Sequence, residues 1–324
     1  MCTAVTYKTK DFYFGRTLDL EYSYNEEVII TPRNYKFNFR HSGSVNSHYA
    51  IIGMAYEIDS YPLYYDAVNE KGLCMAGLSF PESCRYFEYM EDKINIAPFE
   101  FIPFILACCK NTDEAETQLR NLNLVNTNFS ESLPLSPLHF IISDKYKSLT
   151  VESTALGIKI YENEIGVLTN EPPFDYHLYN LRNYMTLSKD IPNNNFSKNI
   201  KLTPYSKGMG AFGLPGDLSS GSRFIRAAFT KLNSVSKDSE NESVSQFFHI
   251  LNNVSHPRGL VHLGDNKYEI TVYSSCMNAD KGIYYYTSYE NSAINAVYMH
   301  NEDLDGNKLI KFKLNKELYI NKQN

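Results

Sequence analysis

Short apolar runs separated by turn residues dominate the first part of the chain and predict β-strands. Such runs, ended by Gly, Pro, Asn or Asp, are typical of strands in antiparallel sheets. The polar stretch Lys8–Asp11 separates Cys2–Tyr7 from Phe12–Phe14, which indicates a hairpin. The further strands predicted here are Glu27–Thr31, Tyr49–Met54, Leu63–Ala67 and Leu73–Leu78, and the polar Arg33–Asn46 is expected to be a loop.

Helical patterns interrupt the strands twice. Pro98 opens the strongly apolar Phe99–Lys110. Thr112 is expected to cap a second helix, Asp113–Leu122, which has acids in its first turn and Arg120 in its last. The second pair of predicted helices is Ser222–Leu232 and Ser243–Asn253.

Between and after these helices the strand pattern returns. Leu138–Ser143, Leu149–Glu152, Gly157–Tyr161 and Gly166–Thr169 are joined by tight turns, which favours an antiparallel meander. Asn193–Asn199 is expected to be a polar loop, and Tyr268–Tyr273, Gly282–Thr287 and Ala293–Met299 are expected to close the chain as strands. Because strand runs and helix runs are segregated, the fold class is α+β rather than alternating α/β. No linker or composition shift divides the chain, so one domain over residues 1–324 is expected.

Composition narrows the choice of partners. The chain has 43% hydrophobic and 21% charged residues, a net charge of −6 and no basic run, so nucleic acid is not an expected partner. No long apolar run or signal-peptide pattern occurs, so no membrane association is expected. The six cysteines lack disulfide-framework spacing and predict free thiols in a cytoplasmic protein, five of them packing residues. With 26 Tyr and 19 Phe, the chain can line an amphipathic pocket with aromatic rings.

Cys2 is the sharpest candidate for chemistry. If Met1 is removed, Cys2 carries both a thiol and a free α-amine, whose ordinary pKa values of about 8.5 and 8 allow them to share a proton near working pH. The hairpin would bring Arg16 and Asp19 back towards the start of the chain. A cation beside a thiol favours the thiolate, and an acid beside an amine can orient it. Taken alone, these residues fit a chance cysteine and a common surface ion pair better than they fit a nucleophilic site.

Other motifs exclude chemistry rather than supply it. Gly208–Gly213 reads G-x-G-x-x-G, but it does not follow a strand, and Leu214–Asp217 stands where a helix should begin. It is interpreted as a glycine-rich loop near a site. The eight histidines show no metal-ligand spacing, so no metal site is expected, and His139 in its apolar strand is expected to be a bonded core histidine.

Several separated motifs occur in an order that closely resembles the choloylglycine hydrolases. The matching segments are Cys2-Thr3, Phe14–Asp19, Asn69–Phe80, Gly166–Pro172, Gly213–Asp217 and Ser222–Phe224. This family contains conjugated bile acid hydrolases and penicillin V acylases and belongs to the N-terminal nucleophile hydrolases. The resemblance covers nearly the whole chain. It implies a four-layer αββα sandwich of two antiparallel sheets between helices, a homotetramer and no cofactor.

The resemblance also implies roles for individual residues. Cys2 would be the nucleophile with its α-amine as base, and Arg16 and Asp19 would hold and tune that pair. Asn170 would donate its side-chain amide to the oxyanion, and Arg223 would complete the polar site. Ser79, where bile acid hydrolases usually carry Asn, would supply its backbone N–H as the second oxyanion donor. The expected apolar wall for the substrate is Leu18, Ile58, Tyr65, Phe129 and Leu133.

The implied function is hydrolysis of the amide between a bile acid and glycine or taurine, through a thioester on Cys2. Two alternatives stay open. One is a penicillin V acylase or another N-acyl amide hydrolase, and the other is a non-catalytic bile-salt- or lipid-binding protein. Without the resemblance, Asn170 would be read as a turn residue before Pro172, and Arg223 as a solvated residue at a helix start. By resemblance to glycine-preferring members, Gly208–Gly210 would favour glycine conjugates.

Overall fold

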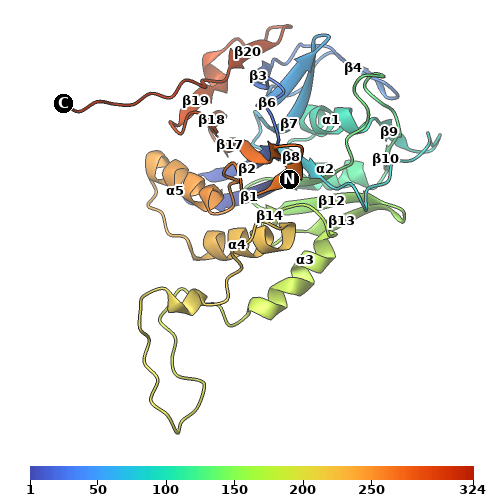
Figure 1. Cartoon of the computed structure of the whole chain (residues 1–324). Coiled ribbons are helices and arrows are strands. Elements are labelled where there is room, and N and C mark those ends of the chain that lie inside the picture. The colour runs from blue at the N-terminus through green and yellow to red at the C-terminus, as the bar shows by residue number, and fades with distance from the viewer.

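The computed structural model describes all 324 residues and consists of two stacked β-sheets with helices on their outer faces (Figure 1). Sheet A has the order β14 (Val167–Leu168), β1 (Cys2–Lys8), β2 (Phe12–Leu20), β17 (Ile270–Asn278), β18 (Ile283–Ser288) and β19 (Asn295–Tyr298). Sheet B has the order β13 (Gly157–Glu162), β12 (Ser148–Thr154), β11 (Leu138–Ser143), β8 (Cys74–Ser79), β7 (Tyr61–Asn69), β6 (Ile51–Ile58), β3 (Glu27–Thr31) and β20 (Ile310–Lys313). Neighbouring strands of both sheets are antiparallel.

The remaining elements are short strands and helices. The strand pairs are β4 (Phe37–Phe39) with β5 (Gly43–Val45), β9 (Ile94–Ile96) with β10 (Leu122–Leu124), and β15 (His262–Gly264) with β16 (Lys267–Tyr268). The α-helices are α1 (Phe101–Cys108), α2 (Thr112–Leu119), α3 (Phe174–Asn180), α4 (Ser220–Asn233) and α5 (Glu240–Asn252). The 3₁₀ turns are η1 (Pro98–Glu100), η2 (Leu181–Tyr184), η3 (Met209–Ala211) and η4 (Met299–Asn301).

The helices cover the outer face of each sheet. On sheet A, α4 contacts β1 and β14, and α5 contacts β1, β2 and β17; on sheet B, α1 contacts β6, β7 and β8. Between the sheets, β1 and β2 contact β8. The apolar core accordingly forms two clusters. One fills the space between the two sheets and extends through sheet A to its helices, and the other lies between sheet B and α1. The predicted α+β class and αββα layering are therefore confirmed.

Most predicted strands are present, but three predictions about elements are wrong. Arg33–Asn46 is not only a loop, because buried Phe37 and Phe39 anchor the β4–β5 hairpin. The helix α2 is capped by Asn111, whose side chain accepts the Glu114 N–H at 2.9 Å, rather than by Thr112. It also ends earlier than predicted, because buried Leu122 begins β10.

The third wrong prediction concerns the stretch Gly166–Thr169. It is not the last strand of a meander with β11, β12 and β13, because β14 leaves sheet B and pairs with β1 in sheet A. This crossover places the residues that follow β14 beside the start of the chain. The helix α3 and the strand β20 were not predicted from the sequence.

All six cysteines are free thiols. Five are buried, including Cys2, whereas Cys108 is exposed and is therefore not the packing residue that was predicted. None of the helices combines the length and apolarity needed to cross a membrane.

Candidate active site

The β1–β2 hairpin brings the predicted residues together at the start of the chain. Cys2 pairs with Leu18 across the hairpin and is only 3% exposed. Because side chains alternate along a strand, Arg16 and Leu18 face one side of β2 and Asp19 faces the other. The Arg16 guanidinium reaches sheet B, where Nη1 donates to the Gly77 carbonyl at 2.5 Å. Asp19 accepts from Thr271 on β17 at 2.6 Å.

A β-bulge in each sheet shapes this place. In sheet B, Met54 pairs with Asp66 and Ala55 with Tyr64, so Tyr65 is the extra residue of β7. A bulge leaves its extra residue outside the ladder and can re-aim it. The Tyr65 carbonyl accordingly accepts a hydrogen bond from Arg16 Nη1 at 3.3 Å.

The bulge in sheet A lies next to the candidate carboxylate. Thr271 pairs with Asp19 and Tyr273 with Leu18, so Val272 is the extra residue of β17. The Asp19 carboxylate accepts hydrogen bonds from two sides, from the Thr271 hydroxyl and from the Thr17 hydroxyl at 2.9 Å. Asp19 is therefore held in one orientation on the helix-covered face of sheet A.

Asn170 is oriented by two donors. Its Oδ1 accepts the Cys2 backbone N–H at 2.8 Å and Arg223 Nη2 at 2.7 Å. Its Nδ2 consequently points the other way and donates to the Ser79 carbonyl at 2.9 Å. Because an amide nitrogen carries two hydrogens, one donor of Asn170 remains for another acceptor.

Arg223 lies in the first turn of α4, where a cation opposes the helix dipole, and it is fully buried. Its compensation is a complete set of acceptors, since Nη1 also binds the Cys2 carbonyl at 2.5 Å and Thr3 Oγ1 at 2.7 Å. Nε donates to the Leu218 carbonyl at 2.9 Å. Burial lowers the pKa of Arg223, whereas Asp19 and Cys2 act to raise it. The side chain thus ties the start of β1 to Asn170.

The backbone of Ser79 faces Asn170. It pairs with Leu138 of β11, but the Leu138 N–H donates to the Tyr86 hydroxyl and the Ser79 carbonyl binds Asn170. The pair is therefore not a hydrogen-bonded one. Since the N–H and C=O of a strand residue leave on the same side, the Ser79 N–H also points towards Asn170.

Arg16 keeps one donor unused. Burial acts to lower its pKa, but Cys2, Tyr273, Asp66 and Asp19 outweigh burial, and the pKa is raised. Nη1 and Nε are bonded to carbonyls, whereas Nη2 is buried without a hydrogen-bond partner. A charged donor is thus available within the cluster.

Met1 occupies the space next to Cys2. Its amine donates to the Asp19 carbonyl at 2.7 Å and pairs with the carboxylate of Glu269. Its carbonyl accepts the Asp19 N–H at 3.0 Å. Cleavage of the Met1–Cys2 bond would convert the Cys2 nitrogen, already 2.8 Å from Asn170 Oδ1, into an α-amine.

The five predicted wall residues divide into two groups. Leu18 and Tyr65 lie beside Cys2 and Arg16. Phe129 instead packs on the rings of Tyr61 and Phe99, at 6.0 and 5.1 Å between centroids. The other members of this second group are Ile58, which pairs with Tyr61, and Leu133, which lies in the same loop as Phe129.

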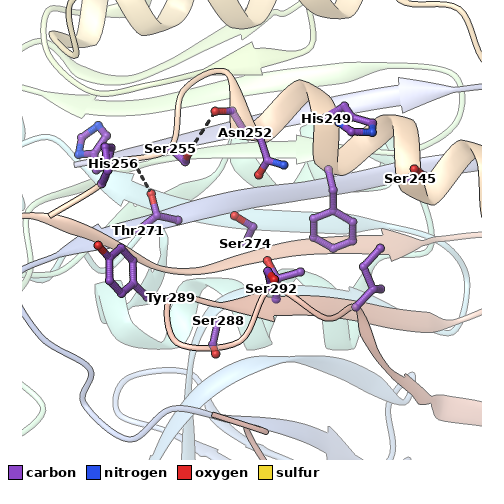
Figure 2. Close-up of a pocket in the computed structure, with 14 residues that line it drawn as sticks. Ser245, His249, Asn252, Ser255, His256, Thr271, Ser274, Ser288, Tyr289 and Ser292 are labelled. Carbon is purple, nitrogen blue, oxygen red and sulfur yellow. Dashed lines mark hydrogen bonds between the residues drawn. The ribbon is translucent and has the colours of Figure 1, made fainter. Parts of the chain in front are cut away.

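Sequence reasoning missed a second row of residues behind Asp19. His256 Nε2 lies 4.0 Å from Asp19 Oδ2. The backbone N–H of His256 donates to Thr271 Oγ1 at 2.8 Å (Figure 2). Burial lowers the pKa of His256 to about 4, although Asp19 acts to raise it, so the imidazole is neutral near pH 7. His256 and Thr271 line a cavity of about 390 Å³ between α5 and the strands β17 and β18, on the helix-covered side of sheet A. No sequence motif marks these residues, because the bulge in β17 and the fold bring them to Asp19.

Two other predictions concern residues outside this cluster. His139 is a bonded core histidine as predicted, with Nδ1 at 3.1 Å from Glu152 and Nε2 at 3.0 Å from the Thr169 carbonyl. The glycine-rich stretch forms η3, and the chain then continues through Asp217 to Leu218, the acceptor for Arg223. No group of three or more His, Cys, Asp and Glu side chains is arranged to hold a metal ion.

Two stacked antiparallel sheets between helices, with a buried cysteine at the start of the first strand, define the N-terminal nucleophile hydrolase fold. The model of the linear amide C–N hydrolases, choloylglycine hydrolase family, matches residues 2–312. The chain belongs to this family and is an amide hydrolase. The family predicted from the separated motifs is therefore confirmed.

Individual relatives agree with this assignment. The chain is 55% identical over 317 residues to the bile salt hydrolase/transferase of Lactiplantibacillus plantarum, which covers 98% of each chain. The crystal structure of a conjugated bile acid hydrolase variant from Clostridium perfringens superposes with a TM-score of 0.93 at 41% identity and full coverage of both chains. A penicillin V acylase from Agrobacterium tumefaciens has a TM-score of 0.76 at 21% identity, covering 96% of this chain and 90% of that one, and shows the fold alone.

Proposed function

We propose that this protein hydrolyses the amide bond between a bile acid and glycine or taurine. The observation that carries the proposal is that Asn170 and Arg223 bond to the backbone of the buried Cys2, on which Arg16 also acts. The names of the relatives, bile salt hydrolase/transferase and conjugated bile acid hydrolase, support the substrate class.

The first chemical step is acylation of Cys2. Its Sγ attacks the amide carbonyl while the α-amine, freed by removal of Met1, accepts the thiol proton. The same amine then gives the proton to the leaving nitrogen, the C–N bond breaks and glycine or taurine departs. In the second step, water gives a proton to the α-amine and attacks the thioester, which releases the bile acid and restores the thiol.

Two donors are suited to the charge that develops on the carbonyl oxygen. We assign this role to the unused hydrogen of Asn170 Nδ2, whose other hydrogen is bonded to the Ser79 carbonyl, and to the backbone N–H of Ser79. Preorganised donors of this kind stabilise the tetrahedral oxyanion. Arg16, with Nη2 free, is assigned to the Cys2 thiolate, and Asp19 to the orientation of the amine end.

The apolar wall of the substrate site is assigned to the two groups described above. Leu18 and Tyr65 would contact the acyl portion next to the scissile bond. Phe129, Ile58 and Leu133 would close over the more distant part of a steroid. Partly exposed apolar side chains are suited to a large apolar ligand, because they lose further contact with water when it binds.

We also infer a homotetramer and a cytoplasmic location. A long segment between η2 and α4 projects from the body of the molecule (Figure 1). Its exposed apolar side chains are Ile191, Phe196, Ile200, Leu202, Tyr205 and Phe212. Such a row of exposed apolar groups supports association with further copies. The free thiols support a reducing compartment.

The proposed substrate is tested by measuring kcat/KM for a glycine-conjugated bile acid and for penicillin V on one preparation. The expected result is a higher value for the bile acid conjugate. A higher value for penicillin V would assign the site to the other branch of the family. If protein with the expected mass and fold released no amine from either substrate, this result would support a non-catalytic binding protein instead.

A further inference from the structure

A second buried carboxylate lies between the two sheets, and none of the steps above uses it. Asp66 on β7 is completely buried. Its oxygens accept hydrogen bonds from the hydroxyls of Tyr273 at 2.8 Å, Ser275 at 2.5 Å and Tyr284 at 3.1 Å. All three donors belong to sheet A, so the carboxylate spans the gap between the sheets. Burial of a carboxylate is costly unless its oxygens accept hydrogen bonds, and here three hydroxyls donate to them.

Asp66 is linked to Arg16 by a short path. The Ser275 hydroxyl accepts the Arg16 backbone N–H at 3.1 Å and donates to Asp66 Oδ2. The preceding residue, Tyr65, gives its carbonyl to the Arg16 guanidinium. The bulge that exposes the Tyr65 carbonyl ends at Asp66, which pairs with Met54. The backbone and the side chain of Arg16 are therefore both held by the segment Tyr65–Asp66 and its partner Ser275.

Four titratable groups face Asp66 from the neighbouring strands. Arg16 faces it from β2, Tyr273 from β17, Tyr284 from β18 and Cys74 from β8. Burial raises the pKa of Asp66, while Arg16 and the three hydroxyls act to lower it. Cys2, Tyr273, Asp66 and Asp19 in turn act to raise the pKa of Arg16. Asp66 and the candidate nucleophile therefore both act on the same guanidinium.

We propose that Asp66 is a positioning residue for the amide hydrolysis, which holds Arg16 and offsets part of its charge next to Cys2. This inference rests on the proposed roles of Cys2 and Arg16. With Asp66 in place, Arg16 attracts the thiolate less strongly. Removing a negative charge favours loss of a proton from any nearby group. Without Asp66, the pKa values of the Cys2 thiol and of its α-ammonium should both fall.

The test is the pH dependence of kcat/KM for Asp66→Asn, measured on protein without Met1 and with a glycine-conjugated bile acid. Both limbs of the profile should move to lower pH by about one unit, the order of size for one nearby charge. The pH dependence of iodoacetamide alkylation at Cys2, followed by mass spectrometry, should shift in the same direction. Asp66→Ser, a second uncharged variant, should give the same shift. If the asparagine variant does not fold, the pH profiles of the serine variant provide the test.

Glu152→Gln is the matched control. Glu152 is a completely buried carboxylate in the same sheet, bonded to His139 and to the Phe174 N–H. Its loss should not move either profile, even if stability falls. A drop in kcat without any shift in the two profiles would reduce Asp66 to a structural residue and overturn the proposal. If no variant and no wild-type protein released amine, the proposed function would fail, but the alkylation profile would still test the link from Asp66 to Cys2.

Discussion

The two sides of Cys2 are built differently. On the helix-covered side of sheet A, the polar side chains bond to one another: Thr17 and Thr271 donate to Asp19, and Thr3 accepts from Arg223. On the side between the sheets, Arg16 has a free Nη2, and its neighbours Leu18 and Tyr65 are largely apolar. On one side, the network side, hydrogen bonds hold the Asp19 carboxylate and the Arg223 guanidinium, and on the other, the apolar side, a buried Arg16 donor next to Leu18 has no hydrogen-bond partner.

This contrast suggests a division of labour. Hydrogen bonds to a buried carboxylate and from a buried guanidinium fix both groups in one arrangement, as positioning a nucleophile and an amine requires. A side with an unpaired donor and apolar side chains offers what a ligand with a carbonyl and a steroid skeleton needs. Changes on the network side should therefore lower kcat, whereas changes on the far apolar group should mainly raise KM.

The largest effect is expected for Asn170→Ala, which removes the side-chain oxyanion donor and the acceptor for Arg223 and Cys2. We expect kcat to fall by about 10²–10³-fold, the usual loss for one oxyanion contact. Steady-state kinetics of protein checked by circular dichroism measures it. Asn170→Asp is the matched variant, because it keeps the oxygen for Arg223 and loses the N–H donor. A fully active aspartate variant would exclude Asn170 as the oxyanion donor.

A smaller effect is expected for Phe129→Ala on the other side. The ring packs on Tyr61 and Phe99 and lies 5.8 Å from the Arg40 guanidinium. Loss of a ring that contacts only the distant part of the substrate should raise KM about 10-fold and change kcat by less than about two-fold. Tyr146→Ala, a change at an 81% exposed ring, is the control and should alter neither. A fall in kcat with an unchanged KM would contradict the placement of Phe129 in the substrate wall.

The smallest effect is expected for Ser79→Ala. We assign the role of oxyanion donor to the backbone N–H of Ser79 and not to its hydroxyl. Alanine supplies the same N–H, so kcat should fall by less than about three-fold, and any larger change should appear in KM. Kinetics of Ser79→Ala and Ser79→Asn on the same substrate provide the measurement. A loss of kcat as large as that of Asn170→Ala would make the hydroxyl a catalytic group.

Sequence reasoning predicted the network side better than the apolar side. Cys2, Arg16 and Asp19 lie in one hairpin, whose turn and alternation can be read locally. Asn170 and Arg223 required motif resemblance, because β14 has only two residues and nothing in its pattern indicates which sheet it joins. The tie between Arg223 and the start of β1 depends on how α4 packs, which no local pattern encodes.

The residues that were missed have a common cause. Thr271, His256 and Glu269 come from the opposite end of the chain and meet Asp19 and Met1 only through the pairing of β17 with β2. The bulges at Tyr65 and Val272 decide which carbonyl and which hydroxyl face the site. A bulge is a mismatch between two strands, so it cannot be read from either strand alone. The loop that carries Phe129 is likewise fixed by rings from other segments.

The central claim is that removal of Met1 creates the base. With Met1 retained, the Cys2 nitrogen is an amide and cannot accept a proton, and the Met1 amine is held by Glu269 and the Asp19 carbonyl. The decisive measurement compares kcat for two preparations of one sequence, one lacking Met1 by intact mass and one carrying an uncleavable amino-terminal extension. We predict turnover only in the first, with equal circular dichroism spectra and equal thermal unfolding midpoints. Equal turnover in both preparations would contradict the terminal-amine mechanism.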